Sequence, residues 1–286
     1  MTSACEKEEQ AMRRLFVALM ALGCIGVGAL ASGEHEGLLP AAAELYPQRY
    51  ELSVLEQLID IYEKALAEKG EDAAVFSRLA QFWYERGILV ADEAEKKENF
   101  ERARDYALAA LRTDPGFAEL ERKEGLVEAI KASDDVAALL WYAAAQGQLL
   151  GMINPLTAFR LMKPVKAAYE RVAELEETFW GCSAIHALGA FEANIATTPI
   201  INLLMRASLE RAREYFERAI ELCPGYLENY VVYARDYAVP KEDGELFREL
   251  LGHVLEAPIG DWPFWNRIAK QEAEALIAAH PELWGE

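Results

Sequence analysis

The sequence predicts an all-α fold in which helices pair along the chain, and three observations support this prediction. Beyond residue 40, apolar residues recur at the three- and four-residue spacing of amphipathic helices. No segment of useful length shows the apolar–polar alternation of a strand. Two segments far apart in the chain also share one helix pattern, as expected of a repeat architecture.

Composition limits the classes of function. The 286 residues are 52% hydrophobic and 27% charged, which supplies a sizeable core and excludes a disordered chain. The net charge of -19 opposes binding to phosphate backbones and to anionic membrane surfaces. We therefore expect no nucleic-acid partner.

The first 33 residues have the pattern of an export signal. Arg13 and Arg14 precede an apolar run over residues 15–31, and small residues end that run. A basic start, an apolar middle and an A-x-A end are typical of a secretory signal peptide. We therefore divide the chain into an export region over residues 1–33 and a helical domain over residues 34–286.

Several outcomes remain open for the processing of this region. The apolar run is short for a membrane span and rich in Gly and Ala, so we favour cleavage after Ala31 over a membrane anchor. Lipid attachment at Cys24 is an alternative because a small residue precedes this cysteine, although the apolar run continues beyond it. The acidic stretch before Met12 suggests that residue as an alternative translation start.

The helices are expected in order, each between recognisable start and stop signals. Gly70 ends the first and Asp72 caps the second, because glycine suits a helix C-terminus and aspartate an N-terminus. Pro115 turns the chain after the third helix, and Asn154 with the proline after it breaks the chain after the fourth. Pro164 fits the first turn of the fifth helix, where its missing N–H is tolerated. The expected ranges are 51–69, 72–90, 95–112, 134–150, 164–175, 179–195, from 209 to just before 224, 226–238, 245–256 and 264–279.

Two repeated segments identify the architecture. Residues 100–115 (FERARDYALAALRTDP) and 209–224 (LERAREYFERAIELCP) align without a gap. They match the second helix of a tetratricopeptide (TPR) repeat, in which small alanines allow close helix approach, an aromatic ring fills the gap to the next repeat and proline ends the helix. We therefore predict a TPR-like helical-hairpin superhelix of about four cryptic pairs plus a C-terminal capping helix. An unrelated helical bundle is the alternative.

Catalytic motifs are absent from the sequence, so we predict no enzyme, no cofactor and no metal. There is no P-loop, no dinucleotide-binding glycine pattern, no G-x-S-x-G elbow and no H-E-x-x-H helix. Cys182, His186 and Cys223 provide at most three zinc ligands, which is a weak site. A disulfide between Cys182 and Cys223 is the better expectation, because antiparallel packing of their helices would bring both ends to one edge.

Adjacent aromatic residues suggest a binding surface. Runs of rings occur at residues 82–84, 141–142 and 262–265. Neighbouring residues on a helix cannot all point the same way, so we expect at least one ring of each run to face solvent, a groove or a subunit interface. Tyr and Trp suit partner recognition there, although most of the rings belong to the core.

Several segments, kept in order, resemble one known family. Residues 135–147 (DVAALLWYAAAQG) are similar to the signature helix of the T-component (TatT) family of tripartite ATP-independent periplasmic (TRAP) transporters. The resemblance covers about residues 50–280. The other similar segments are 97–111 (KENFERARDYALAAL), 230–240 (YVVYARDYAVP), 246–251 (LFRELL) and 266–276 (NRIAKQEAEAL).

The resemblance implies a periplasmic TPR-like protein, usually a lipoprotein, that forms a homotrimer with a central pore. It implies that the substrate-binding P component of a TRAP transporter is the partner, and that a small hydrophobic ligand passes between P component and pore. Two features depart from the family. Cys24 is poorly placed for lipidation, and residues 179–182 have no clear counterpart, so no pore-lining role is assigned to them.

The candidate binding residues are aromatic rings and amides that would dock a partner or line an apolar conduit on the concave face. The alternative function is a general periplasmic TPR scaffold for envelope protein assembly, without a transporter. The main candidates lie on the signature helix, and the residues are Trp141, Tyr142 and Gln146, followed by Tyr84, Asn194 and Tyr230.

Overall fold

The computed structural model describes residues 38–198, 202 and 206–285, and within them it contains helices and no strand. The all-α prediction is therefore confirmed for the described part of the chain. The expected export region, with Met12, Cys24 and Ala31, lies outside the described residues. No candidate for a membrane-spanning helix occurs among the residues that the structure describes.

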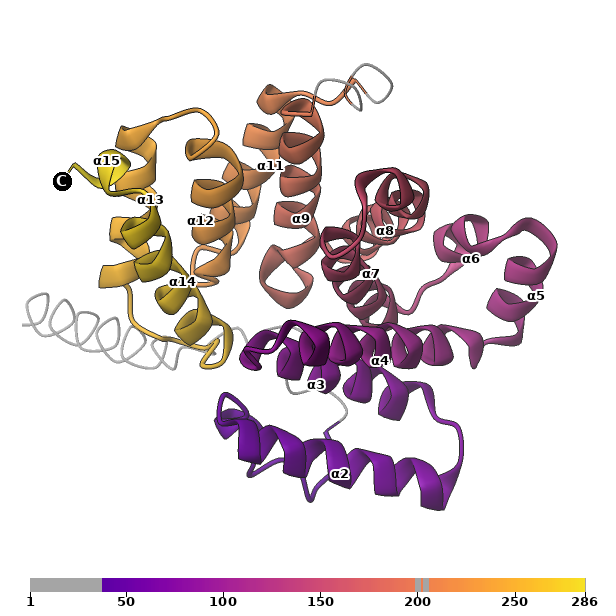
Figure 1. Cartoon of the computed structure of the whole chain (residues 1–286). Coiled ribbons are helices and arrows are strands. Elements are labelled where there is room, and N and C mark those ends of the chain that lie inside the picture. Colours follow the sequence, from indigo (N-terminus) through magenta and orange to yellow (C-terminus); the bar gives the residue numbers. More distant parts are fainter. Residues whose placement is uncertain (1–37, 199–201, 203–205, 286) are drawn as a thin grey trace, which may run out of the picture. The chain divides into compact units, whose positions relative to one another are not determined.

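The helices follow one another along the chain as coloured and labelled in Figure 1. Their bounds are η1 Tyr46–Gln48, α2 Leu52–Lys69, α3 Ala73–Leu89, α4 Glu93–Arg112, α5 Pro115–Glu124, α6 Leu126–Ala132, α7 Val136–Gly151, α8 Pro155–Leu175, α9 Phe179–Ala196, α11 Leu209–Leu222, α12 Glu228–Tyr233, η2 Ala234–Ala238, α13 Gly244–Glu256, α14 Trp265–Ala279 and α15 Pro281–Trp284.

Side-chain caps determine where many of these helices begin. Asp72 accepts a hydrogen bond from the N–H of Val75 at 3.0 Å, as predicted for the start of α3. Gly70, with φ +85°, ends α2. Because each cap satisfies N–H groups that have no partner within the helix, the connecting loops can be short. The other capping side chains are Asp92, Asp114, Asp135, Asn154, Ser208 and Asp243.

Two predicted breaks are helix starts. Pro115 turns the chain after α4, but it also occupies the first turn of α5, a helix that the sequence analysis missed together with α6. Asn154 accepts a hydrogen bond from the N–H of Thr157 at 3.0 Å, and Pro155 begins α8. The placement of Pro164 in a first turn is therefore wrong, because α8 starts earlier and encloses this proline.

Helices that are close in sequence pack against each other. α2 packs on α3, α3 on α4, α7 on α8 and α9 on α11 (Figure 1). Ala103, Ala107 and Ala110 of α4 are fully or almost fully buried, which permits close approach of the neighbouring helices α3 and α7. This pairing agrees with helical hairpins, whereas the specific TPR-like superhelix and its number of pairs stay predictions.

The aromatic segment before and within α14 packs against the first helices. The ring of Trp265 lies 6.0 Å from that of Tyr84 in α3, measured between centroids. Phe264 lies 5.4 Å from the guanidinium of Arg49, which is completely buried and donates to the Glu85 carboxylate at 3.1 Å. A solenoid with contacts only between neighbouring repeats would lack these contacts. α14 therefore does more than cover the last pair, which was its predicted role.

A left-handed turn begins α9. Trp180, Gly181 and Cys182 have φ angles of 49°, 65° and 64°, a region that residues other than glycine rarely adopt. Cys182 forms a disulfide with Cys223, with Cα atoms 6.0 Å apart. The disulfide ties this turn to the end of α11, and Tyr226 packs directly against Gly181.

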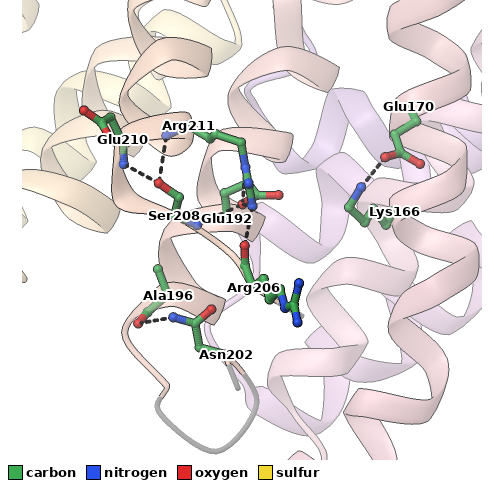
Figure 2. A network of polar contacts seen from close by, with 9 residues as sticks. All are labelled: Lys166, Glu170, Glu192, Ala196, Asn202, Arg206, Ser208, Glu210 and Arg211. Atoms are coloured by element: carbon green, nitrogen blue, oxygen red, sulfur yellow. Dashed lines mark hydrogen bonds and ion pairs between the residues drawn. The ribbon is translucent and has the colours of Figure 1, made fainter. Parts of the chain in front are cut away.

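Polar contacts connect the end of α9 to the start of α11 (Figure 2). Glu192 of α9 accepts hydrogen bonds from the Arg211 guanidinium at 2.8 Å and from the N–H of Ser208 at 3.2 Å. Arg211 also donates to the carbonyl oxygen of Arg206 at 2.6 Å. These contacts hold the C-terminal half of α9, which contributes to the site described below.

The left-handed turn generates a stability prediction. A Cβ atom on Gly181 would lie 2.3 Å from Cγ of Tyr226, at a φ of +65°. We expect Gly181→Ala to lower the free energy of unfolding by about 2–4 kcal/mol, measured by urea denaturation. Gly252→Ala is the matched control, because no atom lies within 4 Å of its added Cβ. In the middle of α13 the control should be neutral or raise stability by up to about 1 kcal/mol. Equal stability of the two variants would contradict the prediction.

Candidate functional site

Six aromatic rings form a closed cycle of contacts in the core, which we call the aromatic cycle. They come from α3, α7, α9 and α14, and from the segments before α12 and α14. Tilted and edge-to-face pairs such as these are favourable geometries for aromatic rings. The centroid distances around the cycle are 5.8 Å for Tyr84–Trp141, 4.9 Å for Trp141–Trp180, 5.7 Å for Trp180–Trp262, 4.9 Å for Trp262–Tyr226, 6.5 Å for Tyr226–Trp265 and 6.0 Å for Trp265–Tyr84.

A small cavity of about 40 Å³ lies beside the aromatic cycle, and we call it the chamber. All members of the cycle except Trp262 line it. A water molecule needs roughly 10–15 Å³ of such space, so the chamber has room for a few waters or for a head group of a few atoms. The remaining lining residues are Leu140, Ala144, Tyr169, Ser183, His186 and Glu228.

His186 is a neutral imidazole in the wall of the chamber. Its Nδ1 lies 2.7 Å from Oδ1 of Asn229, whose Nδ2 donates to the carbonyl oxygens of Gly181, Ala219 and Cys223. This arrangement orients the Asn229 amide, so Nδ1 of His186 carries the proton and donates it. Burial lowers the pKa of His186 to about 4, although the bond to Asn229 acts in the opposite direction. At neutral pH the imidazole therefore brings no charge to the site.

Glu228 is the carboxyl group of the chamber. Burial, and then the nearby Glu272 carboxylate, raise the pKa of Glu228 to about 7. The hydroxyl of Tyr226 donates to its Oε2 at 2.9 Å and opposes this shift, as does Arg235. Glu228 is therefore the group of the chamber whose charge changes near neutral pH.

A larger groove of about 490 Å³ adjoins the chamber and shares lining residues with it. Residues of α3, α7, α8, α9, α12, η2 and α14 form its walls. Most of its side chains are apolar, which suits the hydrocarbon part of a ligand. The shared residues are Tyr84, Ala144, Tyr169, His186, Glu228 and Trp265, and the apolar side chains of the groove include Ile88, Leu150, Met162, Val165, Phe191, Ile195, Val232 and Ile268.

Charged residues occupy one wall of the groove. Arg235 donates to both carboxylate oxygens of Asp236, at 2.9 and 3.0 Å, and also pairs with Glu272. With Glu228, the groove thus has three carboxyl groups and one guanidinium. The guanidinium is already engaged by two carboxylates, so this wall has a negative balance.

The structure divides the candidate residues of the sequence analysis into two groups. Tyr84 lines both chamber and groove, Trp141 lines the chamber, and the exposed Asn194 lines the groove. We expected at least one ring of the 141–142 run to face solvent, a groove or a subunit interface. Neither ring faces solvent, because each is 3% exposed where α7 packs against α3, α4 and α8. The candidates that are buried and line neither space are Tyr142, Gln146 and Tyr230.

Sequence analysis missed the polar residues of the site. His186 was considered only as a metal ligand, and Glu228 was not considered. A signal existed for two of them, since Glu228 and Arg235 are seven residues apart and therefore share a helix face. Their meeting with His186 and Trp265 depends on how four separate helices pack, which helix periodicity alone does not predict.

The residues that the structure describes contain no metal-binding cluster. No group of three or more His, Cys, Asp or Glu side chains there is placed to hold a metal ion. Cys182 and Cys223 are joined by the disulfide, and Nδ1 of His186 is used by Asn229.

The raised pKa of Glu228 predicts a pH-dependent effect of its removal. The pKa of Glu228 is higher in the folded protein, at about 7, than its ordinary value of 4.5. The free energy of unfolding of the protein therefore falls as pH rises from about 4.5 to about 7. At pH 8 we expect Glu228→Gln to be more stable than the parent protein by about 1–3 kcal/mol in urea unfolding, with the gap closing toward pH 5. Glu274→Gln, an exposed position on α14, is the charge-matched control and should show a small difference at every pH. A gap for Glu228→Gln that does not change between pH 5 and pH 8 would argue against a Glu228 carboxyl that titrates near neutral pH.

Comparison with known protein families gives a match over most of the chain. The family model TAtT, described as the TRAP transporter T-component, matches residues 29–284, which is most of the chain. A search of curated proteins gave no match.

Proposed function

The chain belongs to the TRAP transporter T-component family, and we propose that it is a periplasmic accessory component that binds the substrate-binding P component and receives a small hydrophobic ligand in its groove. Membership of this family is the observation that supports a role in TRAP transport. It favours this role over a general scaffold for envelope assembly.

The groove is the observation that supports a ligand. Its volume of about 490 Å³ lies in the usual range for small-molecule sites, roughly 300–1,000 Å³. Apolar side chains from α3, α7, α8, α9, α12 and α14 surround it, so a hydrocarbon group leaving water would be stabilised there. An accessory protein that hands a solute to or from its partner needs a site of this kind.

We also propose that the protein reaches the periplasm through its first 33 residues. The family match begins at residue 29, at the end of the apolar run, which fits a mature domain that starts near this point. Cleavage after Ala31 remains our preferred processing, with lipidation at Cys24 as the alternative. A homotrimer is the assembly that we propose on the basis of the family.

Blocking the groove tests the ligand-binding part. Ala187 of α9 is a small, partly buried groove residue, and a tryptophan there would occupy part of the volume. We expect Ala187→Trp to weaken binding of the neutral apolar dye N-phenyl-1-naphthylamine at least tenfold, measured by fluorescence titration. Ala94→Trp adds the same ring at an exposed position of α4 outside the groove and should bind the dye as the parent does. Equal dye binding by all three proteins would place the apolar site elsewhere.

Partner binding is tested with the P component of the same transport system. We expect the two purified proteins to form a complex in size-exclusion chromatography with light scattering. Asn194→Arg, at an exposed position of the groove, should weaken the complex, because the added long charged side chain would obstruct a partner that covers the groove. Gln57→Arg, at an exposed position of α2, is the control. Absence of any complex with the parent protein would contradict the proposed partnership.

A further inference from the structure

We propose that the chamber binds the positively charged head group of an amphipathic ligand, an alkylammonium compound in chemical class, while the groove holds the apolar part of the same molecule. This inference rests on the proposed function, since it specifies which kind of ligand the groove receives. It follows from three properties of the chamber: aromatic walls, a carboxyl group and the lack of a positive charge among its lining residues.

The aromatic walls provide the first argument. Tyr84, Trp141, Trp180, Tyr226 and Trp265 all line the chamber, and Tyr169 adds another ring. The negative faces of Trp and Tyr rings attract ammonium groups, and several rings around one cavity are the usual way in which proteins hold methylated ammonium groups. A purely apolar ligand needs no such concentration of Trp and Tyr.

Charge provides the second argument. Glu228 is the one acidic residue in the lining of the chamber, and no Lys or Arg contributes to that lining. His186 stays neutral because burial disfavours its charged form, and this outweighs the opposite effect of its hydrogen bond to Asn229. In the adjoining groove, Asp236 and Glu272 both pair with Arg235 and neutralise it. A cation that enters through the groove therefore meets carboxylates and no free positive group in the lining.

The alternatives fit less well. An anionic head group would face Glu228 and would find only neutral donors, such as the hydroxyl groups of Tyr84 and Tyr169. An uncharged hydroxyl head group could donate a hydrogen bond to the Glu228 carboxylate, but it would bring no positive charge to that carboxylate and no cation–π attraction to the rings. The Glu228 carboxyl is held by one hydrogen bond from Tyr226, which leaves its other oxygen available for an ammonium group.

A ligand series with one tail and three head groups tests the proposal. The probes are octyltrimethylammonium, octan-1-ol and octanoate, each below its critical micelle concentration, added to the full mature chain at pH 8. Binding is measured by isothermal titration calorimetry and by quenching of tryptophan fluorescence, since Trp141, Trp180 and Trp265 line the chamber. We expect the ammonium compound to bind at least tenfold more tightly than octan-1-ol and octanoate to bind most weakly.

Two variants separate the head-group site from the groove. Glu228→Gln keeps a side chain of the same size and removes the charge, so it should weaken binding of the ammonium compound at least tenfold and change that of octan-1-ol less than twofold. Glu274→Gln makes the same change in net charge at an exposed position and should have no effect on either ligand. For the parent protein, affinity for the ammonium compound should also rise between pH 6 and pH 8, as Glu228 loses its proton.

The outcomes distinguish this inference from the proposed function. If octan-1-ol and octyltrimethylammonium bind equally and Glu228→Gln weakens neither, the head-group assignment is overturned while apolar binding in the groove stands. Tightest binding of octanoate would also overturn the assignment. If none of the three probes binds and the dye does not bind either, the ligand-binding part of the proposed function fails and this inference fails with it.

Discussion

The site depends on the contact between the segment around α14 and the helices at the start of the domain. Trp265 lies against Tyr84, and Phe264 lies near the buried Arg49, so residues far apart in sequence close the aromatic cycle. The buried Arg49–Glu85 pair lies beside this contact, since the Arg49 guanidinium is 5.4 Å from the centroid of the Phe264 ring. Without α14 in this place the chamber would lose the ring of Trp265, and the groove would lose the carboxylate of Glu272.

The left-handed turn has a direct consequence for this cycle. Trp180, the first residue of the turn, contacts both Trp141 and Trp262 and therefore links α7 to the segment before α14. A regular helical start for α9 would point this ring elsewhere. The disulfide to Cys223 and the close packing of Tyr226 on Gly181 hold the backbone in a conformation that is otherwise unfavourable for Trp and Cys. The strain at residues 180–182 thus coincides with the wall of the chamber.

Local features of the sequence predicted the fold well and the site only in part. Caps such as Asp72 and terminators such as Gly70 act within one helix turn, so their consequences are visible in sequence. α5 and α6 were missed because Pro115 signals a turn and a helix start alike. Tyr84 and Trp141 were found through their aromatic character, but the burial of Trp141 was not, because α7 is covered by three helices and has no solvent face at that ring. The charged wall escaped prediction since acidic residues are common throughout this chain and only tertiary packing singles out Glu228.

The position of Glu228 argues for a role in binding over a role in stability. A partly buried carboxyl whose pKa is raised to about 7 lowers the stability of the folded protein as pH rises from about 4.5, and a glutamine or methionine would avoid this loss. Its one hydrogen bond, from Tyr226, does not require a charge, because a glutamine oxygen can accept the same bond. Asp236 and Glu272 already neutralise Arg235, so Glu228 is not needed to compensate that guanidinium. Within the described residues Glu228 accepts one hydrogen bond, from Tyr226, and is attracted by Arg235, which Asp236 and Glu272 already neutralise. A cation in the chamber would give this carboxylate a partner that offsets its cost to folding.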